Sequence, residues 1–260
     1  MATATQTNQF QKKVAALVKQ SQSMEETEVK KVLAILQSTR KEIAATVAST
    51  PWELYHLKQL KDAVNRAADD FVRQYKDVLG PAQRDLWNQG VDMVDMPLRA
   101  VGIWQAIPAI DTTMLGVLQG YGESLAEVLG KDLAQKVTQE ITMGLLGQKT
   151  PFDVMKSIGV NLKEKSIVTS IGSRAETITR TEGGRILEAA SQARKEKAAE
   201  VVPGLQKMWL HGNTSKVPRI THVAANGQIR DVDQPFDVGG EQLMYPRDPA
   251  GSPENTINCS

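Results

Sequence analysis

The residues best suited to chemistry lie in the last third of the chain, from about Arg174 to Ser260. His211 and His222 stand eleven positions apart, and Cys259 follows close to the end of the sequence. Imidazole and thiolate groups are common zinc ligands, and a thiol beside an imidazole can also act as a nucleophile with its base. Structural zinc takes four ligands, however, and the spaced cysteine pairs that often supply them are missing. We therefore predict no metal site and no cofactor, and His211, His222 and Cys259 are weak candidates only.

Catalysis is not predicted either. The lone cysteine has no supporting pattern around it, and no pair of carboxylates stands beside an activated group. The stretch from Gly144 to Thr150 approaches a phosphate-binding loop, but Gln148 separates the glycine from Lys149, and the segment before it has a helical pattern. We predict that the protein is not an enzyme. A metal-assisted enzyme built on the two histidines and the cysteine is the least favoured alternative.

A long polar helix, predicted from about Lys165 to Glu200, offers a different kind of contact. Its basic residues, with Trp209 beyond it, are the candidates for contact with nucleic acid or with a partner: Arg174, Arg180, Arg185, Arg194, Lys195 and Lys197. From Phe152 to Glu200, however, nine basic residues accompany seven acidic ones. This balance is more typical of a solvated helix with i,i+4 ion pairs than of a surface that binds phosphates. A nucleic-acid-binding module that uses this helix remains the main alternative function.

Trp209 has two interpretations. The favoured one places Trp209 and Phe236 in the core of a small C-terminal domain, because large aromatic residues are mostly buried. The other makes Trp209 an anchor for a partner protein, since aromatic residues are common at the centre of interfaces.

Composition narrows the class of protein. The chain has 260 residues, 41% of them hydrophobic and 23% charged, with a net charge of +1. It can therefore form a packed core, and the charge argues against a protein that coats nucleic acid. The single cysteine excludes an internal disulfide framework. The first ten residues lack the basic and apolar regions of a secretory signal, and no run approaches the length of a membrane span, so we expect neither.

Apolar residues recur at helical spacing along most of the chain. Ser23 with Glu26 resembles a capping box, and Thr50-Pro51 and Thr150-Pro151 are typical helix starts. Gly80-Pro81 is expected to end a helix, and 97–112 to form an apolar joint between helices. Three or four amphipathic helices in succession indicate a helical bundle or long helical hairpins.

The last part of the chain has a different pattern. Short β-like segments at Lys207–Leu210 and Gln242–Tyr245 alternate with turn residues, and Asn226-Gly227 is a strong tight-turn signal. The predicted fold class is mainly α, with an N-terminal helical bundle or long helical hairpins followed by a small α+β C-terminal domain. The predicted domains are a helical region at 1–100, a helical connector at 101–165, and 166–260, which combines the polar helix with the small α+β module.

An ordered set of residues resembles one known family. The set runs Arg180-Thr181-Glu182, Trp209, Arg219-x-x-His222, Asn226-Gly227-Gln228, Phe236, Gly239-Gly240, Leu243, Pro246-x-Asp248-Pro249, Glu254 and Ile257-Asn258-Cys259. It resembles the phage Mu F-like minor head proteins, also called the phage head morphogenesis family, over roughly residues 150–260. The segment from about Asp111 is similar to the region that usually precedes that domain.

The resemblance implies a minor head protein of a tailed phage. Such proteins act in head assembly at the portal vertex or in the head interior, and some are linked to packaged DNA or its ejection. The implied partners are the portal protein, the major capsid protein or both; contact with packaged double-stranded DNA and a homo-oligomer are left open. The implied location is the phage head, with the host cytoplasm during assembly. The chain departs from the family at Asn213, where aspartate is frequent, and at Cys259-Ser260, where Cys-Arg-Cys is frequent.

Overall fold

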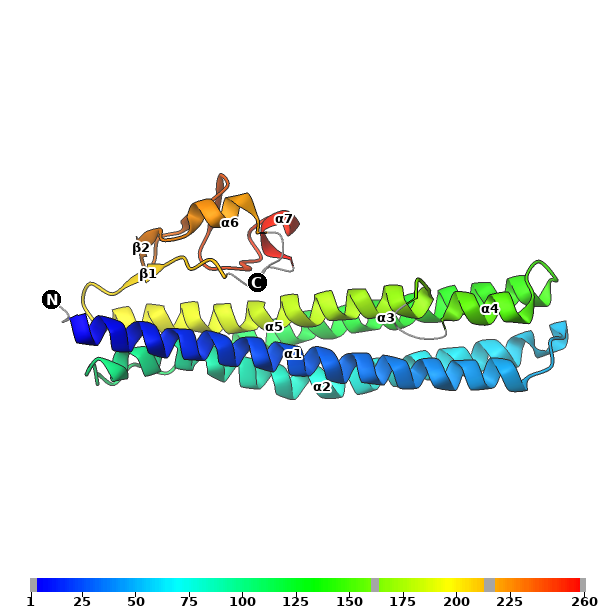
Figure 1. Ribbon diagram of the computed structural model, residues 1–260. Coiled ribbons are helices and arrows are strands. Elements are labelled where there is room, and N and C mark those ends of the chain that lie inside the picture. Colours follow the sequence, from blue (N-terminus) through cyan, green and yellow to red (C-terminus); the bar gives the residue numbers. More distant parts are fainter. Residues whose placement is uncertain (1–3, 160–163, 213–217, 258–260) are drawn as a thin grey trace. The chain divides into compact units, whose positions relative to one another are not determined.

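A computed structural model describes residues 4–159, 164–212 and 218–257 (Figure 1). Helices make up 72% of the described residues, and the strands among these residues are confined to a small C-terminal region. Both observations confirm the predicted class, mainly α with a small α+β end. Among the described residues, no helix combines the length and the apolar character that crossing a membrane requires.

Long helices precede the small C-terminal elements. The helical part comprises α1 (Ala4–Ser49), the 3-10 helix η1 (Leu54–His56), α2 (Leu57–Ala100), α3 (Thr113–Leu145), α4 (Pro151–Ile158) and α5 (Ile167–Ala199). The C-terminal elements are β1 (Gln206–Met208), α6 (Ile220–Ala225), β2 (Ile229–Asp231), β3 (Phe236–Val238), β4 (Glu241–Leu243) and α7 (Pro253–Thr256). We call the described residues from 206 to 257 the C-terminal module.

Contacts divide the chain into two compact units. The first comprises Met1–Glu26, Ala82–Leu118 and Arg180–Ser260; the second comprises Thr27–Pro81 and Gln119–Thr179. The second unit has a large apolar core, whose most buried bulky side chains include Phe71, Tyr75 and Leu129. The Tyr75 hydroxyl donates to the backbone oxygen of Ala175 at 3.1 Å, which satisfies the one polar atom this ring brings into the core.

Two predicted helix boundaries in the first quarter of the chain are wrong. α1 runs without a break past Ser23 and Glu26, because residues 4–49 contain neither proline nor glycine to interrupt its hydrogen bonds. Thr50 does not cap the next helix. Its hydroxyl donates to the backbone oxygen of Thr46 at 2.8 Å and so completes the end of α1, while α2 begins only at Leu57.

The predicted end at Gly80-Pro81 is also wrong, because α2 continues through both Pro81 and Pro97. A proline inside a helix costs about 3 kcal/mol. Leu79 and Leu86, two residues before and five residues after Pro81, are both buried, and burying a leucine contributes roughly 1.5–3 kcal/mol. Packing therefore outweighs the local preference.

The start predicted at Thr150-Pro151 is confirmed. The backbone N–H of Asp153 donates to the Thr150 hydroxyl at 3.1 Å, and the Asp153 carboxylate accepts from the backbone N–H of Thr150 at 3.3 Å. α3, in contrast, begins earlier than its glycines suggest, because the Asp111 carboxylate accepts from the backbone N–H of Thr113 at 2.9 Å.

The C-terminal module contains two small antiparallel sheets. β1 pairs with β2, with Met208 opposite Ile229, and β3 pairs with β4, with Phe236 opposite Leu243. The predicted turn at Asn226-Gly227 is confirmed: Gly227 has φ 82°, and its N–H donates to the backbone oxygen of Trp209 at 2.9 Å.

The module also has a hydrophobic core of its own. This core contains only residues of the module: Trp209, Ala225, Phe236, Val238 and Leu243. The favoured interpretation of Trp209 as a core residue is therefore confirmed.

Candidate functional site: a polar interface under the C-terminal module

The C-terminal half of α5 presents two different faces within the first unit. Ile186, Leu187 and Ala190 pack with Leu86 and Trp87 in an apolar cluster. Another stripe on α5 is polar and comprises Glu182, Arg185, Glu188, Gln192 and Lys195, at spacings of three and four residues. Such spacings place residues on one face of a helix. Contacts of Arg185 and Gln192, described below, show that this stripe faces the C-terminal module (Figure 1).

The prediction of a solvated polar helix is therefore wrong for this half of α5. Glu182 and Gln192 are each 3% exposed, and Arg185 and Arg194 are each 8% exposed. Sequence counts of acidic and basic residues predict charge balance, but they cannot tell a solvated helix from one covered by another part of the chain. Here a polar stripe is covered, and its charges are paired inside the protein.

Glu182 and Arg185 form the centre of the interface. The Arg185 guanidinium donates from Nη1 to both carboxylate oxygens of Glu182, at 2.8 Å each. Its Nε also donates to the backbone oxygen of Arg247 at 3.3 Å. Burial is the largest effect on Glu182 and raises the pKa of its carboxyl, although the neighbouring Arg185 opposes that shift. The pair thus links α5 directly to the tail of the module.

Arg247 crosses the helix at a glycine. A β-carbon at position 184 would overlap the Arg247 guanidinium, so only glycine leaves room for that side chain against α5. Beyond Gly184, Arg247 Nη1 donates to Glu25 of α1 at 2.9 Å, and both side chains of this ion pair are about nine-tenths buried. Arg247 itself has φ 65°, a left-handed conformation that is uncommon for a residue other than glycine. Arg247 thus makes its contact with Glu25 from a strained backbone conformation.

Gln192 and Lys207 form a second contact. Gln192 Nε2 donates to the backbone oxygen of Val232 at 2.9 Å, and its Oε1 accepts from Lys207 Nζ at 3.3 Å. Lys207 Nζ also donates to the backbone oxygen of Met244 at 2.8 Å and lies 5.1 Å from the centroid of the Phe236 ring. The lysine is 3% exposed, so its charge rests on these neighbours.

Several ionisable groups in this interface have shifted pKa values. Burial is the first cause in each case: it lowers the pKa of Lys207 to about 8 and raises the pKa of Tyr245 to about 12. Burial also raises the pKa of Glu188 and lowers that of Lys195, and each of these groups partly offsets the shift of the other. All four shifts favour the neutral form, as expected where a polar interface excludes water.

Arg194 serves a separate contact in the first unit. Its Nε and Nη2 donate to the two carboxylate oxygens of Asp95 at 2.7 and 2.8 Å, and its Nη1 donates to the backbone oxygen of Pro108 at 2.5 Å. The apolar joint predicted at 97–112 is thus tied to α5 by a buried, bidentate ion pair.

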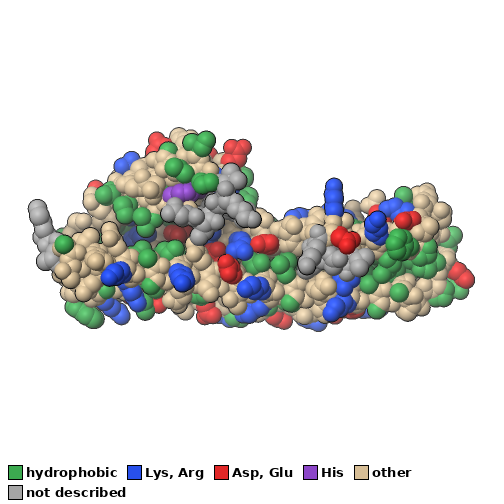
Figure 2. Space-filling view, viewed as in Figure 1, with side chains coloured by type: hydrophobic (Ala, Val, Ile, Leu, Met, Phe, Trp, Pro, Cys, Tyr) green, Lys and Arg blue, Asp and Glu red, His purple; other side chains and the backbone are tan. Residues whose placement is uncertain are grey.

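The other basic candidates have different surroundings. Arg174 is exposed and pairs with Asp132, and Lys197 pairs with Glu200 at 2.7 Å. Arg180 and Lys195 are partly buried on α5. On the face of the molecule shown in Figure 2, basic and acidic side chains are interspersed along the helices. The structure does not bring the six basic candidates together on one exposed face of α5, since Arg185 and Arg194 are buried in ion pairs.

The candidate metal ligands form no metal site within the described chain either. His222 is buried, its ring stands edge-on to Trp209 at 5.7 Å, and its Nε2 lies 3.2 Å from the backbone oxygen of Asn255. Burial lowers the pKa of His222. Cys259 lies outside the described residues. Among residues 4–159, 164–212 and 218–257, no group of three histidine, cysteine, aspartate or glutamate side chains is placed to hold a metal ion.

Several interface residues were not singled out from the sequence. Glu25 lies 222 positions from its partner Arg247, and nothing in the local pattern around either residue predicts that pair. One signal was available at Gly183-Gly184, since two adjacent glycines in the middle of a predicted helix are unfavourable unless something needs the space. Lys207 gave a weaker signal, as a charged residue inside a β-like segment beside Trp209.

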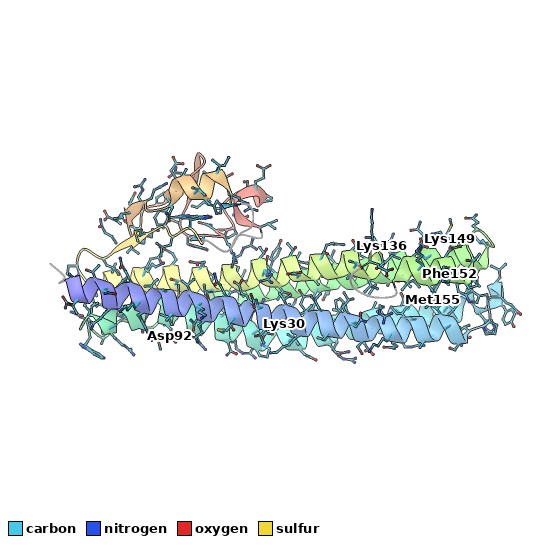
Figure 3. All side chains as sticks on the ribbon, in the orientation of Figure 1. Lys30, Asp92, Lys136, Lys149, Phe152 and Met155 are labelled. Carbon is cyan, nitrogen blue, oxygen red and sulfur yellow. The ribbon has the colours of Figure 1, made fainter. Side chains whose placement is uncertain are left out.

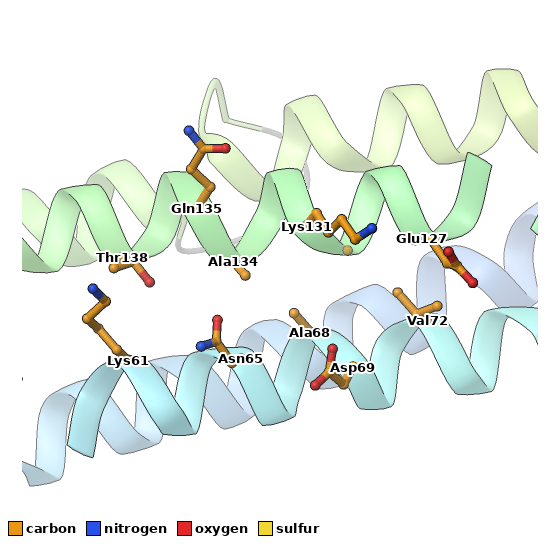
Figure 4. A pocket seen from close by; sticks show the side chains of 11 residues that line it. Lys61, Asn65, Ala68, Asp69, Val72, Glu127, Lys131, Ala134, Gln135 and Thr138 are labelled. Carbon is orange, nitrogen blue, oxygen red and sulfur yellow. The ribbon is translucent and has the colours of Figure 1, made fainter. Parts of the chain in front are cut away.

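Two further features lie in the second unit. An open groove between α2 and α3 is lined by residues that include Lys61, Asp69, Glu127 and Lys131, so both charges are present at its rim (Figure 4). Lys149 lies at the turn from α3 to α4 (Figure 3) and pairs with Glu140 at 2.5 Å. Neither feature gathers groups of one charge or a set of potential nucleophiles.

Comparison with protein-family models, with curated proteins and with solved structures found no match.

Proposed function

We propose that this chain is a minor head protein of a tailed phage, which acts in head assembly at the portal vertex or in the head interior. The observation that supports this proposal most is the use of the residues that resemble the Mu F-like family. Several of them build the core and the turns of the C-terminal module, and Glu182 pairs with Arg185 in the interface on α5. This is the behaviour of a structural module and not of a reaction centre.

Motif residues from distant parts of the sequence meet in the module. The Trp209 ring stands edge-on to Phe236 at 5.3 Å and to His222 at 5.7 Å. The Asp248 carboxylate accepts from the backbone N–H groups of Met244 and Ala250 at 2.8 and 2.9 Å, which shapes the tail around Pro246-x-Asp248-Pro249. Because these four residues have structural tasks, their presence in the motif needs no catalytic or metal chemistry to explain it.

The module also presents apolar side chains to solvent, as a protein-binding surface would. We call this surface the module apolar face; its members are Met208, Leu210, Ile220, Val223 and Ile229, each at least half exposed. Met208 and Ile229 are opposite each other in the sheet of β1 and β2. Leu210 and Val223 lie near the Asn226 turn, because the Asn226 side chain accepts from the backbone N–H of His211 at 2.9 Å and the Asn226 backbone N–H donates to the backbone oxygen of Val223 at 3.2 Å. Ile220 begins the same short helix, α6, three residues before Val223. Exposed apolar groups that gather in one place are typical of binding sites.

The portal protein and the major capsid protein are the proposed partners, in the phage head and, during assembly, in the host cytoplasm. Contact with packaged double-stranded DNA, a role in its ejection and a homo-oligomer remain part of the proposal as open alternatives. A nucleic-acid-binding role through α5 is less favoured, because Arg185 and Arg194 are engaged in buried ion pairs. Binding to DNA that does not weaken as salt rises would contradict that alternative.

The proposal can be tested by co-expressing the chain with the portal and major capsid proteins of the phage that encodes it. We expect the chain to sediment with portal rings or procapsids. The double variant Met208→Ser/Ile229→Ser should lose that association, while Val117→Ser, which changes an exposed apolar residue of α3 outside the module, should keep it. Failure of the unaltered chain to sediment with either partner would contradict the proposal.

A further inference from the structure

The C-terminal module is joined to the helices of the first unit mainly through polar and charged side chains. Its hydrophobic core, from Trp209 to Leu243, includes no residue of α5. Ile186, Leu187 and Ala190 of α5 in turn belong to a cluster with Leu86, Trp87 and Leu115, and this cluster includes no residue of the module. The module and α5 each bury these apolar residues in a cluster of their own. The hydrophobic effect therefore does not oblige the two to stay together.

The contacts between them are of a kind that water can replace. They include the ion pair of Arg247 with Glu25, the hydrogen bond from Arg185 to the Arg247 backbone, and the bonds of Gln192 to Val232 and Lys207. A buried ion pair gains little net free energy, because the attraction between the charges is nearly offset by the loss of their hydration. Separation would return these groups to water at a small cost.

The segment that connects α5 to the module can accommodate such a movement. α5 ends at Ala199, and the chain reaches β1 at Gln206 through a short turn that contains Pro203 and Gly204. Both residues are exposed, and Gly204 has φ 75°. Few backbone angles in this turn need to change for the module to rotate as a body.

We propose that the C-terminal module is a reversible latch, which leaves α5 as a folded body when the Arg247 contact over Gly184 is broken. Undocking exposes the polar stripe of α5 and the face of the module that covers this stripe, while the helices and the core around Trp209 stay intact. The inference is independent of the proposed phage role, since it concerns only contacts within the first unit.

The latch can be measured by the distance between two spin labels. One is attached at Lys12→Cys on α1 and the other at Gln234→Cys in the module, both exposed positions of the first unit, in a chain that also carries Cys259→Ser. The labelled chain without further substitutions should give one main peak in the distribution of distances between the two labels. Gly184→Ala, Glu25→Gln and their combination should add a second, broader population, with the open fraction rising roughly tenfold for a single change.

A matched control and a second readout separate undocking from unfolding. Gly116→Ala places the same substitution in α3, where a β-carbon meets no neighbour, and should leave the distance distribution unchanged. In the latch variants the amides of Trp209 and Gly227, which bond inside the module, should keep their protection from hydrogen exchange. A single unchanged distance peak even in the double variant would overturn the proposal, and so would loss of protection at Trp209 and Gly227 whenever the second population appears.

Discussion

The guanidinium of Arg247 occupies the space that a β-carbon at position 184 would need. This relationship ties the tail of the module to the middle of α5, and it explains why a residue unfavourable to helices stands inside one. From this position the side chain reaches Glu25, at 2.9 Å. The latch thus depends on glycine at position 184, which has no side chain, and on the long charged side chain of Arg247.

Replacing Gly184 by alanine should destabilise the protein although alanine is the better helix former. The gain of up to about 1 kcal/mol in helix propensity is outweighed by the displaced Arg247 and its broken ion pair, and we expect a net loss of about 1–3 kcal/mol in the free energy of unfolding. Gly116→Ala should instead stabilise by up to about 1 kcal/mol, since its β-carbon meets no neighbour. Urea denaturation of the two variants provides the comparison, and equal stabilisation by both would contradict the role of Gly184.

Glu25 and Arg247 should show measurable coupling in a double-mutant cycle. With Glu25→Gln and Arg247→Gln we expect a coupling free energy of about 1–3 kcal/mol, because both side chains are largely buried. The exposed pair of Lys197 and Glu200 is the control and should couple by no more than about 0.5 kcal/mol. Similar values for the two pairs would show that the buried pair has no special part in the interface.

Replacing Arg194 should lower the free energy of unfolding more than replacing Arg99, an exposed residue that also pairs with Asp95. Arg194→Met leaves Asp95 buried without its bidentate partner and should cost about 3–5 kcal/mol. Arg99→Met removes a longer, exposed contact to Asp95, at 3.7 Å, and should cost at most about 1 kcal/mol. Thermal or urea unfolding gives both values, and a small loss for Arg194→Met would mean that the 97–112 joint does not need this tether.

Lys207 should make stability depend on pH in the mildly alkaline range. Burial lowers its folded-state pKa to about 8 from 10.5, so between these values the unfolded chain binds more protons than the folded one. The contribution of Lys207 to stability therefore rises with pH through this window, by at most about 1.4 kcal/mol per pH unit, and is lost progressively as pH falls from about 10.5 to about 8.

The comparison is with Lys207→Met, measured by urea denaturation from about pH 7.5 to about pH 9.5. The unaltered protein should gain stability relative to this variant as pH rises. A constant difference across the range would mean that the buried amine keeps an ordinary pKa.

Local sequence signals were enough to predict the class of fold and several elements. The capping pattern at Thr150 and the turn at Asn226-Gly227 depend only on neighbouring residues, and both are present as predicted. The same kind of signal was misleading at Gly80-Pro81, because the burial of Leu79 and Leu86 outweighs the local cost of a proline. Helix boundaries set by packing between distant segments are not encoded in neighbouring residues.

The interface was less predictable than the fold. Arg185 and Arg194 drew attention as basic residues on a polar helix, but their ion pairs depend on which distant elements cover that helix. Charge counts describe a composition and not a surface, so they could not separate buried pairs from a solvated face. The paired glycines at Gly183-Gly184 were the one local sign that another part of the chain comes close.

The most direct test of the proposed function is quantitative mass spectrometry of purified particles of a phage whose genome carries this sequence. DNA-filled particles are compared with particles that have ejected their genome. We expect the protein in filled particles at a discrete copy number; equal amounts in emptied particles would make it a fixed head component, and its loss would make it one that leaves with the DNA. Absence from both kinds of particle would contradict the assignment to the phage head.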